Sequence, residues 1–563
     1  MIKGIWCCVV AVACIGSGGC ASGKVVLTVG RPVDGADMTA TIQRMIDSAA
    51  TYQGRKPVEI RLQPGVYNIS RQNATCRYQH ITNTTSVSEN PDPVKHYGLY
   101  LHHMSDVTID GRGATLLTHG EMTSMAVDSC SRIQLKNLTI DAADPSVPEM
   151  TVLARNDSTL VCRLAKTTRC HIAPDSRLSW VGHGWEFSGG IAQLYDGKHT
   201  WRCQSPMERY VNASIDGDVV TLCYRTGEAP ECEPGQVYQM RHSYRTEVAT
   251  FINRSSDISL HNVTYHFLGN FGIVGQFSHN VTLDRVICAP DPASDRTCAG
   301  FADFMQMSGC SGMVRIKDCD FSGAHDDPIN VHGTHLKVTG YDGAWMTVRF
   351  MHGQTFGFVP FAVGDEVAAV NACTLRAVAS AVVKNVQPID DYNYRIMLDS
   401  DISGALQGLD EVVVENVTAT PEVEITGCRF TLTPTRGVLL TTSRKALIAD
   451  NTFVNIPMSA ILIADDGRSW YESGPVRDVT IIRNRFIDCA SPVISISPEN
   501  SEYDGPVHSG IRIISNEFIF SDKDSEPVIV SAKATDGLIV KKNKVNCRYS
   551  PILLKDCTDS DVE

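Results

Sequence analysis

A short pattern that recurs along most of the chain constrains its fold more than any other feature. Each copy has an aliphatic residue, two variable residues, often an Asn or a Cys, one further residue, and then an aromatic or aliphatic residue. The copies are LKNLTI (135–140), LHNVTY (260–265), LDRVIC (283–288), IKDCDF (316–321), ITGCRF (425–430), IADNTF (448–453), IIRNRF (481–486), IISNEF (513–518) and a weaker VKKNKV (540–545). Successive copies lie 23, 32 or 33 residues apart over most of the chain.

A self-similar unit of roughly 20–35 residues is typical of a solenoid. Each unit alternates apolar and polar residues, is rich in β-branched residues and is bounded by Asn, Gly and Asp, so it is built from strands. One unit alone cannot bury its apolar face, and stacked units must therefore share a continuous core. We predict an all-β fold, a right-handed parallel β-helix, because a β-propeller needs longer repeats and four antiparallel strands per blade. The recurrent Asn is expected to form a side-chain ladder at a turn, where Asn tolerates the left-handed backbone conformation.

Two intervals break the period. The motif ending at Ile140 is followed by the next one only at Tyr265, and the motif ending at Phe321 only by that at Phe430. Removing one coil from each interval leaves insertions of about 100 and about 80 residues, and both contain alternating strands and turns. We expect each to be a small antiparallel β-barrel-like domain. The predicted organisation is a signal peptide (1–20), an N-terminal cap with the first coils (21–144), a first inserted β-domain (145–245), central coils (246–334), a second inserted β-domain (335–421) and C-terminal coils (422–563).

Two further segments of the chain carry structural signals. Residues 37–50 have apolar side chains at helical spacing and predict a short helix that caps the end of the solenoid. The first insertion is rich in aromatic residues, which we expect mainly in the core of that domain, with stacking on a sugar as the alternative. These residues are Trp180, Trp185, Phe187, Tyr195 and Trp201.

The first twenty residues are typical of a targeting segment. Lys3 is followed by an apolar run over residues 5–15, which is too short to span a bilayer, and then by small residues up to Cys20. This end resembles a bacterial lipoprotein cleavage box, although Ser17 stands where Leu is usual. We expect an exported protein, in the periplasm or at the cell surface, that is attached to a bacterial membrane through a lipid on Cys20. Simple secretion is the alternative.

The formal net charge of −13 argues against nucleic acid or an anionic membrane surface as the main partner. The chain has 20 cysteines but no CxxC pair and no His/Cys cluster with metal-ligand spacing, so we expect no metal and no other cofactor. The cysteines inside the repeat are expected to be small buried apolar side chains. Disulfide pairing and oligomeric state do not follow from the sequence.

The densest group of chemically reactive side chains lies between the two insertions. The segment FADFMQMSGC contains Asp303, and SGAHDDPINVHGTH contains Asp326 and Asp327. Asp303 and Asp326 are 23 residues apart, which is the shorter coil period. In a stacked parallel β-helix they should therefore be neighbours on adjacent coils, about 4.8 Å apart along the axis. Pro328 cannot continue a regular ladder, so a bend is expected to bring Asp327 to the same groove.

Carboxyl groups this close raise one another's pKa, because removing a second proton places like charges together. The result is one protonated and one ionised carboxyl at neutral pH, as glycoside hydrolysis requires. An inverting enzyme holds its carboxyls about 6.5–9.5 Å apart and a retaining enzyme about 5 Å, and the residues alone leave both open. Because Asp-Asp-Pro is also a good turn, a purely structural role is the alternative.

Five further residues are candidates for binding a sugar. His325, Asn330 and His332 adjoin the aspartates and are expected to form hydrogen bonds with sugar hydroxyls. Trp470 and Glu472 lie in a polar and aromatic loop between two coils. A Trp face stacks on the apolar C–H face of a sugar, and a carboxylate accepts hydrogen bonds from its hydroxyls. The alternative for each of the five is a structural role.

The segments FADFMQ, SGAHDDPINVHGTHL and DDGRSWYESGPVRD resemble glycoside hydrolase family 110, a group of bacterial exo-acting α-1,3-galactosidases. The resemblance extends over the mature chain and includes both insertions. It implies a β-helix with three aspartates arranged as in polygalacturonases, inversion of configuration, no metal, and removal of terminal α-1,3-linked galactose. The substrates implied are blood-group-B-type glycans and linear αGal-1,3-Gal ends. It also implies that Asp326 is the general acid, and that Asp303 and Asp327 hold and activate the attacking water.

Two other functions stay open beside this one. A polygalacturonase-like hydrolase or a pectate-lyase-like enzyme would share the fold, although a lyase needs Ca²⁺ carboxylates and a basic residue, and no run of Lys or Arg adjoins the aspartates. A non-catalytic glycan-binding solenoid would need no paired acids. The expected partners are terminal α-galactosyl oligosaccharides or glycoconjugates, with or without a fucosylated branch.

Overall fold

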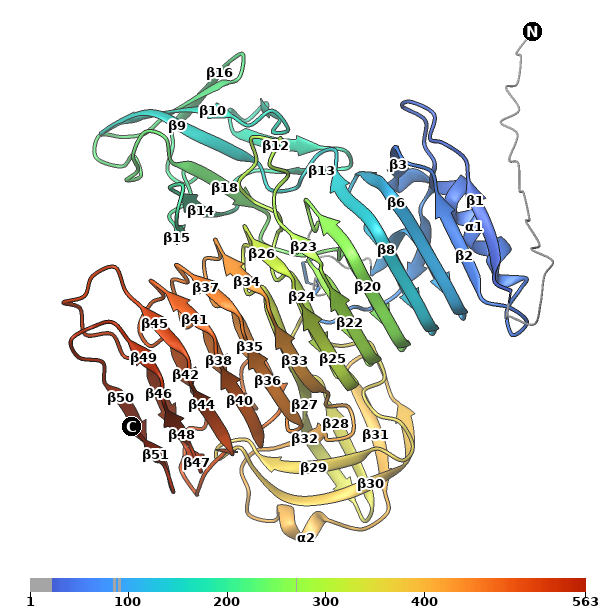
Figure 1. Cartoon of the computed structure of the whole chain (residues 1–563), viewed down its shortest axis with the longest axis vertical. Helices are drawn as coiled ribbons and strands as arrows, with labels where there is room; N and C mark the ends of the chain where they lie inside the picture. Colours follow the sequence, from blue (N-terminus) through green and yellow to red (C-terminus); the bar gives the residue numbers. More distant parts are fainter. Residues whose placement is uncertain (1–22, 85–87, 90–92, 270) are drawn as a thin grey trace.

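Residues 23–84, 88–89, 93–269 and 271–563 are described by the computed structural model of this chain. The predicted leader, residues 1–20 with Cys20, lies outside them. The fold is all-β, as predicted, and few residues are helical (Figure 1). The helical segments are α1 (Thr39–Ala50), η1 (Arg71–Asn73) and α2 (Ser403–Leu406). Within the described ranges, no helix is long and apolar enough to cross a membrane.

A parallel sheet runs along the whole solenoid and contains the start of each repeat motif. Its strands, each paired in parallel with the next, are β1 (Val25–Val29), β2 (Val58–Leu62), β6 (Ser105–His119), β8 (Ser131–Ala142), β20 (Ser256–Tyr265), β22 (His279–Asp284), β25 (Ser311–Lys317), β33 (Glu422–Thr426), β36 (Lys445–Ala449), β40 (Asp478–Ile482), β44 (Ile511–Ile514), β48 (Ile539–Lys541) and β51 (Asp561–Val562). The motifs stack in register, since Leu260 pairs with Leu283 and Ile316 pairs with Ile425. The predicted parallel stacking of coils is therefore confirmed.

Two further rows of parallel strands complete the coils. The ends of the motifs form one row, with β3 (Val66–Ser70), β23 (Ile287–Cys288), β26 (Asp320–Ser322), β34 (Arg429–Thr431), β37 (Thr452–Val454), β41 (Arg485–Ile487), β45 (Glu517–Ile519) and β49 (Lys544–Val545). The other row contains β5 (Val94–His102), β7 (Thr123–Asp128), β19 (Thr250–Asn253), β21 (Ile273–Gln276), β24 (Met305–Ser308), β27 (Ile329–Asp342), β35 (Val438–Leu440), β38 (Ile461–Ile463), β42 (Ile494–Ile496), β46 (Val530–Lys533) and β50 (Ile552–Lys555). Short strands at the margins are β4 (Thr75–Tyr78), β39 (Glu472–Ser473), β43 (His508–Ser509) and β47 (Thr535–Asp536).

The last residues of the motifs fill the centre of the solenoid. Phe430 stacks on Phe453 with ring centroids 4.5 Å apart, and the same row of rings continues in both directions through Phe321, Phe486 and Phe518. At one end of this core lies α1, which buries Ile42 and Ile46 as the sequence predicts. Apolar burial of this kind is the main favourable contribution to folding.

The polar ladder inside the coils agrees with the prediction on two coils, where Asn137 and Asn262 occupy the left-handed position, and differs on the later ones. On those later coils the left-handed position is occupied by the residue before the recurrent Asn, as at Asp450, Arg483 and Ser515. The following Asn points into the stack, where its side chain bonds the backbone of the neighbouring coil. These ladder residues are Asn451, Asn484, Asn516 and Asn543. Asn is selected here because its amide both donates and accepts hydrogen bonds, which matches unpaired backbone groups at a turn.

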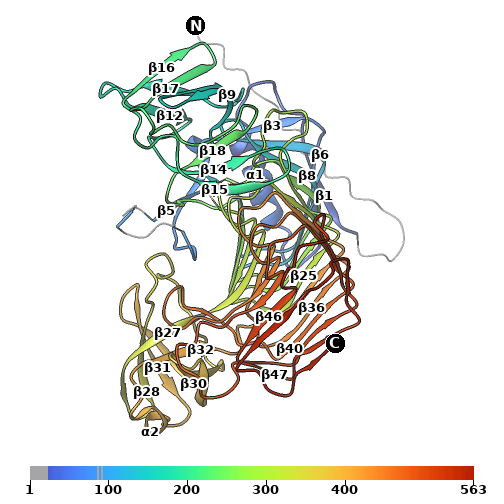
Figure 2. The ribbon, with the colours of Figure 1, turned by 90° about the vertical axis from the view of Figure 1, so that its left-hand side faces the viewer.

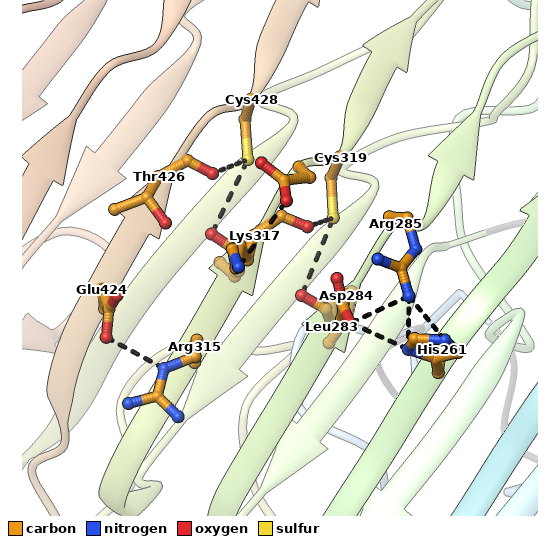
Figure 3. A network of polar contacts seen from close by, with 12 residues as sticks. His261, Leu283, Asp284, Arg285, Arg315, Lys317, Cys319, Glu424, Thr426 and Cys428 are labelled. Atoms are coloured by element: carbon orange, nitrogen blue, oxygen red, sulfur yellow. Dashed lines mark hydrogen bonds and ion pairs between the residues drawn. The ribbon is translucent and has the colours of Figure 1, made fainter.

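Cysteines replace Asn in this ladder on two central coils (Figure 3). The Cys428 thiol lies 3.4 Å from the carbonyl oxygen of Thr426, and the Cys319 thiol lies 3.2 Å from that of Lys317. On the outer face of the same sheet, Arg315 pairs with Glu424 of the next coil. All 16 described cysteines are free thiols, so those within the repeat act as buried weak donors, in agreement with their expected packing role.

The first insertion forms an antiparallel sheet with the strand order β15-β14-β18-β9-β10-β17-β16. Its strands are β9 (Glu149–Asn156), β10 (Thr159–Leu164), β14 (Ile191–Tyr195), β15 (Thr200–Cys203), β16 (Asn212–Asp216), β17 (Val219–Cys223) and β18 (Val237–Arg241). A smaller sheet beside it contains β11 (Cys170–Ile172), β12 (Leu178–Gly182) and β13 (Trp185–Phe187). The predicted barrel-like shape is wrong here, because within the described residues no pairing joins β15 to β16 and the sheet stays open.

The second insertion closes into a six-stranded antiparallel barrel, as expected. Its strands are the outer half of β27, β28 (Trp345–Arg349), β31 (Asn393–Leu398), β30 (Arg376–Pro388), β29 (Glu366–Asn371) and β32 (Val412–Asn416), which pairs back to β27. Both insertions extend outward from the solenoid and are well separated in Figure 2. The exact division of the chain into six segments stays a prediction.

Replacing Asn484 by Ala should lower the free energy of unfolding by about 2–4 kcal/mol, because it leaves the backbone N–H of Asn451 and the carbonyl of Ile448 buried without partners. Chemical denaturation monitored by circular dichroism measures the change. The exposed Asn212→Ala on β16 is the matched control and should change the free energy by less than about 0.5 kcal/mol. Equal losses in the two variants would show that the ladder has no special role.

Candidate active site

A hollow of about 330 Å³ lies beside the row that contains β24, β27, β35 and β38. All three predicted aspartates line it, together with Asn330, Trp470 and Glu472. The other principal lining side chains are Asn83, Arg202, Arg245, Arg436, Asp466 and Glu499. The structure therefore brings together six of the eight residues that the sequence selected, from positions far apart in the chain.

The strand register explains how the aspartates meet, and it differs from the expected one by a single residue. Met305 on β24 pairs with Ile329 on β27, an offset of 24, so Asp303 is in register with Asp327 and not with Asp326. The backbone N–H of Phe304 donates to the carbonyl of Asp327 at 3.3 Å, which places the two segments side by side. Asp326 lies one residue further out, directly before the turn into β27.

Asp327 is fixed by the coil that follows it. One of its carboxylate oxygens accepts a hydrogen bond from the backbone N–H of Arg436 at 3.0 Å, and the other lies 3.1 Å from the Arg436 guanidinium. Because Ile329 pairs with Val438, Arg436 occupies the register position of Asp327 on the next coil. The side chain of Asp327 is only 5% exposed, so this pair holds a negative charge inside the protein.

Asp326 faces the first insertion. Its carboxylate lies 3.1 Å from the guanidinium of Arg202 on β15, and its side chain is 24% exposed, compared with 5% for that of Asp327. Burial raises the pKa of Asp326, and the neighbouring Asp327 raises it further. Arg202, Arg241 and Arg245 act in the opposite direction, because their positive charges favour the carboxylate.

Asp303 is buried, as Asp327 is. Burial raises its pKa well above the usual range, and the charges of Asp326 and Asp327 add to the effect. Arg245 opposes this shift only in part. Since Asp303 and Asp326 both have raised pKa values beside a third carboxyl, the cluster is built to keep a proton at a pH where isolated aspartates are ionised.

Two further arginines, Arg241 and Arg245, lie close enough to the acids for their charges to act on Asp326. Arg241 lies over the ring of Phe301, with its guanidinium carbon 5.1 Å from the ring centre, and burial together with Arg245 lowers its pKa to about 10. Arg245 lies over the ring of Phe271 at 4.8 Å and donates to Gln354 of the barrel insertion at 2.9 Å. Aromatic faces thus replace water around charges that remain close to the acids.

The loop that contains Trp470 and Glu472 is held by a single carboxylate. Asp466 accepts hydrogen bonds from the backbone N–H groups of four successive residues, Arg468 to Tyr471. The Trp470 ring stacks on that of His352 from the barrel insertion, with centroids 4.4 Å apart. Glu472 lies 3.5 Å from the amide nitrogens of both Asn330 and Asn83. A rigid loop therefore presents an indole face and a carboxylate at the hollow.

His325 and His332 are not among the residues that line the hollow. The Nε2 atom of His325 is buried without a hydrogen-bond partner in the described structure, and burial lowers the pKa of this imidazole well below its usual value. His332 lies between Gln306, at 2.7 Å, and Glu472, at 3.6 Å. Their positions suit support of the lining residues better than direct contact with a ligand.

The positively charged half of this site was not predicted from the sequence. Arg436 was within reach, because the segment PTRGVLL occupies the coil position of DDPINV one step along the repeat. Arg202 and Arg245 gave no such signal, since Arg202 lies in an insertion that does not share the repeat and Arg245 in the segment that follows it. Among the described residues, no group of three or more His, Cys, Asp or Glu side chains is arranged to hold a metal ion.

Comparison with known proteins identifies clear relatives. The family model named GLAA-B β-barrel domain II matches residues 346–412, within the second insertion. Alpha-1,3-galactosidase A of Bacteroides thetaiotaomicron is 45% identical over 91% of this chain and 90% of the relative. The protein of the same name from Streptomyces avermitilis is 34% identical over 91% and 85%, and alpha-1,3-galactosidase B of B. thetaiotaomicron is 30% identical over 91% and 84%. Among solved structures, the Streptococcus pneumoniae adhesin PfbA is 13% identical over 95% of this chain and 98% of its own, with a TM-score of 0.42.

Asp303→Asn should make the protein more stable than the wild type at pH 8 while the two are nearly equal at pH 4. A carboxyl whose pKa is raised by folding loses stability as the pH rises from its unfolded pKa through its folded one, and Asn avoids that loss. We expect the unfolding midpoint at pH 8 to rise by about 1–3 °C in a thermal scan.

Asp450→Asn is the matched control for this change. Asp450 pairs with Arg483 on the solenoid surface, and that arginine lowers its pKa, so the same substitution should slightly reduce stability at pH 8. An Asp303→Asn protein that unfolds below the wild type at pH 8 would contradict the assignment of Asp303 as a destabilised acid.

Proposed function

This chain belongs to the α-1,3-galactosidase family, and from that membership we propose that it hydrolyses terminal α-1,3-linked galactose at the ends of oligosaccharides and glycoconjugates. The observation that supports this function is the hollow with three aspartates, two of which have raised pKa values. An enclosed hollow of this size accommodates the end of a glycan chain, which fits an exo-acting enzyme. The proposed substrates are blood-group-B-type glycans and linear αGal-1,3-Gal ends.

Asp326 is the general acid in this proposal. It is the partly accessible acid on the side of the first insertion, where a leaving group can reach it. Its raised pKa keeps the proton to a higher pH than in an ordinary aspartate, and the leaving oxygen takes that proton as the glycosidic bond breaks. Arg202 then stabilises the carboxylate that remains, so the same contact favours the transfer.

Asp303 and Asp327 hold and activate the attacking water. Asp327 is anchored by Arg436 with both oxygens, so its position is fixed before the substrate binds. Asp303 is in register with it on the preceding coil. Attack from the side opposite to the leaving group inverts the configuration and gives β-galactose as the first product.

Trp470, Glu472 and Asn330 bind the galactose in this proposal. The indole stacks on the apolar face of the sugar, and the carboxylate and amide bond its hydroxyls. His332 acts on Glu472, which it contacts, and His325 stays a predicted binding residue. The proposal also includes the right-handed winding of the solenoid and export of the protein with a lipid on Cys20.

Asp326→Asn should lower kcat by a factor of about 10² to 10⁴ on linear αGal-1,3-Gal oligosaccharides, while the sugar still binds. Galactose release and its anomeric form are followed by proton NMR, with fucose-branched substrates in parallel. The wild type should release β-galactose first. Release of α-galactose first would contradict inversion, and no release from either substrate would contradict the proposed function.

Arg202→Met tests the role of Asp326 as the acid. Removing this positive charge raises the pKa of Asp326, so the loss of kcat/KM on the alkaline side should move to higher pH. Arg163→Met on β10, whose partner Asp218 is exposed, is the control and should leave the profile unchanged. An upward shift of the acidic limb instead would show that Asp326 acts as the base.

A further inference from the structure

A second hollow, of about 310 Å³, lies between the first insertion and the solenoid and is nearly as large as the one with the aspartates. Aromatic side chains form much of its lining: Trp185, Phe187, His242 and Tyr244. Three acidic residues, Glu89, Glu121 and Glu186, also line it. The proposed catalytic mechanism uses none of these seven residues.

The four aromatic rings form a continuous row. The centroids of Trp185 and Phe187 are 5.7 Å apart, those of Phe187 and His242 are 5.2 Å apart, and those of His242 and Tyr244 are 3.6 Å apart. Only Phe187 is fully part of the buried core of the insertion, and the other three rings are half-buried. A row of partly exposed aromatic faces beside a hollow is a surface on which sugar rings can stack.

The Trp185 ring is held in place by its own strand pair. Gly182 on β12 pairs with Trp185 on β13, and a Cβ atom at position 182 would lie within 2.5 Å of three indole atoms. The absence of a side chain at Gly182 therefore lets the indole lie against the backbone. Trp180, by contrast, is completely buried, as the sequence analysis expected for the aromatic residues of this insertion. Of the two tryptophans in this three-stranded sheet, Trp185 is therefore the one whose side chain is accessible to a ligand.

This hollow is a neighbour of the catalytic one and is distinct from it. Tyr244 and Thr246 line the second hollow, whereas Arg245, between them, lines the hollow with the aspartates. A single segment of the chain therefore separates the two. A glycan chain whose end occupies the catalytic hollow, or a neighbouring chain on the same glycoconjugate, would lie within reach of the aromatic row.

We propose that the second hollow is a binding site for a neutral, galactose-containing glycan chain, and this inference rests on the proposed function. The half-buried rings of Trp185, His242 and Tyr244 take the C–H faces of sugar rings, and Glu121 and Glu186 accept hydrogen bonds from hydroxyls. These two carboxylates and the net charge of −13 disfavour sulfated or uronic acid chains. The site would hold the enzyme on a glycan surface between cleavage events.

Native electrophoresis through gels that contain soluble β-1,4-galactan tests this site without any hydrolysis. The wild type should be retarded, and Trp185→Ala should weaken the apparent binding by at least about fivefold, because it removes the largest stacking face. His242→Ala removes a ring that lies outside the buried core of the insertion, and it should weaken the apparent binding to the same extent. This variant decides the question if Trp185→Ala does not fold. The same variants should hydrolyse p-nitrophenyl α-galactoside at the wild-type rate.

Two control variants distinguish the sites. Trp470→Ala removes the indole of the catalytic hollow and should keep the retardation, as should Trp345→Ala, a half-buried indole on the barrel. A wild type that runs unretarded, variants of the row that bind as well as the wild type, or a loss confined to Trp470→Ala would each overturn the inference. A wild type that does not hydrolyse p-nitrophenyl α-galactoside would instead count against the proposed function alone.

Discussion

The hydrogen-bonded register between neighbouring coils places the central acids of this protein and the arginine that binds one of them. Parallel pairing fixes the position of each residue relative to the coil before and after it, so residues separated by one coil in sequence become neighbours in space. Asp303, Asp327 and Arg436 occupy equivalent positions on three successive coils in this way. A shift of the register by one residue would turn their side chains to the other face and dissolve the site.

The same register concentrates like charges, and the arginines balance that cost. Three carboxyls on adjacent coils, two of them buried, disfavour ionisation of all three. Arg436 pairs with Asp327, while Arg202, Arg241 and Arg245 oppose but do not cancel the raised pKa of Asp326. The result is one acid paired with an arginine beside two acids that hold protons more tightly, which is the asymmetry that acid–base catalysis requires.

The repeat allowed the sequence to predict the solenoid, its apolar core and the grouping of the three aspartates, because periodic spacing maps directly onto parallel strands. It missed the true offset of 24 at Asp303, because this coil contains one residue more than the shorter coil, at the register shift that follows Ser311 in β25. It placed Asn in the left-handed position, which holds for Asn137 and Asn262, whereas Asp450 and Arg483 occupy that position on later coils. Arg202 and the shape of its open sheet lay beyond prediction, because the docking of an insertion onto a solenoid follows no period.

The central claim is that burial and like charges raise the pKa values of Asp303 and Asp326, and infrared spectroscopy tests it most directly. The carbonyl band of protonated carboxylic acids should persist in the wild type above the pH at which ordinary aspartates ionise, and it should lose intensity in Asp303→Asn and in Asp326→Asn, but not in Asp450→Asn. Complete loss of the wild-type band near pH 4, where ordinary aspartates with a pKa of about 3.9 ionise, would contradict the account.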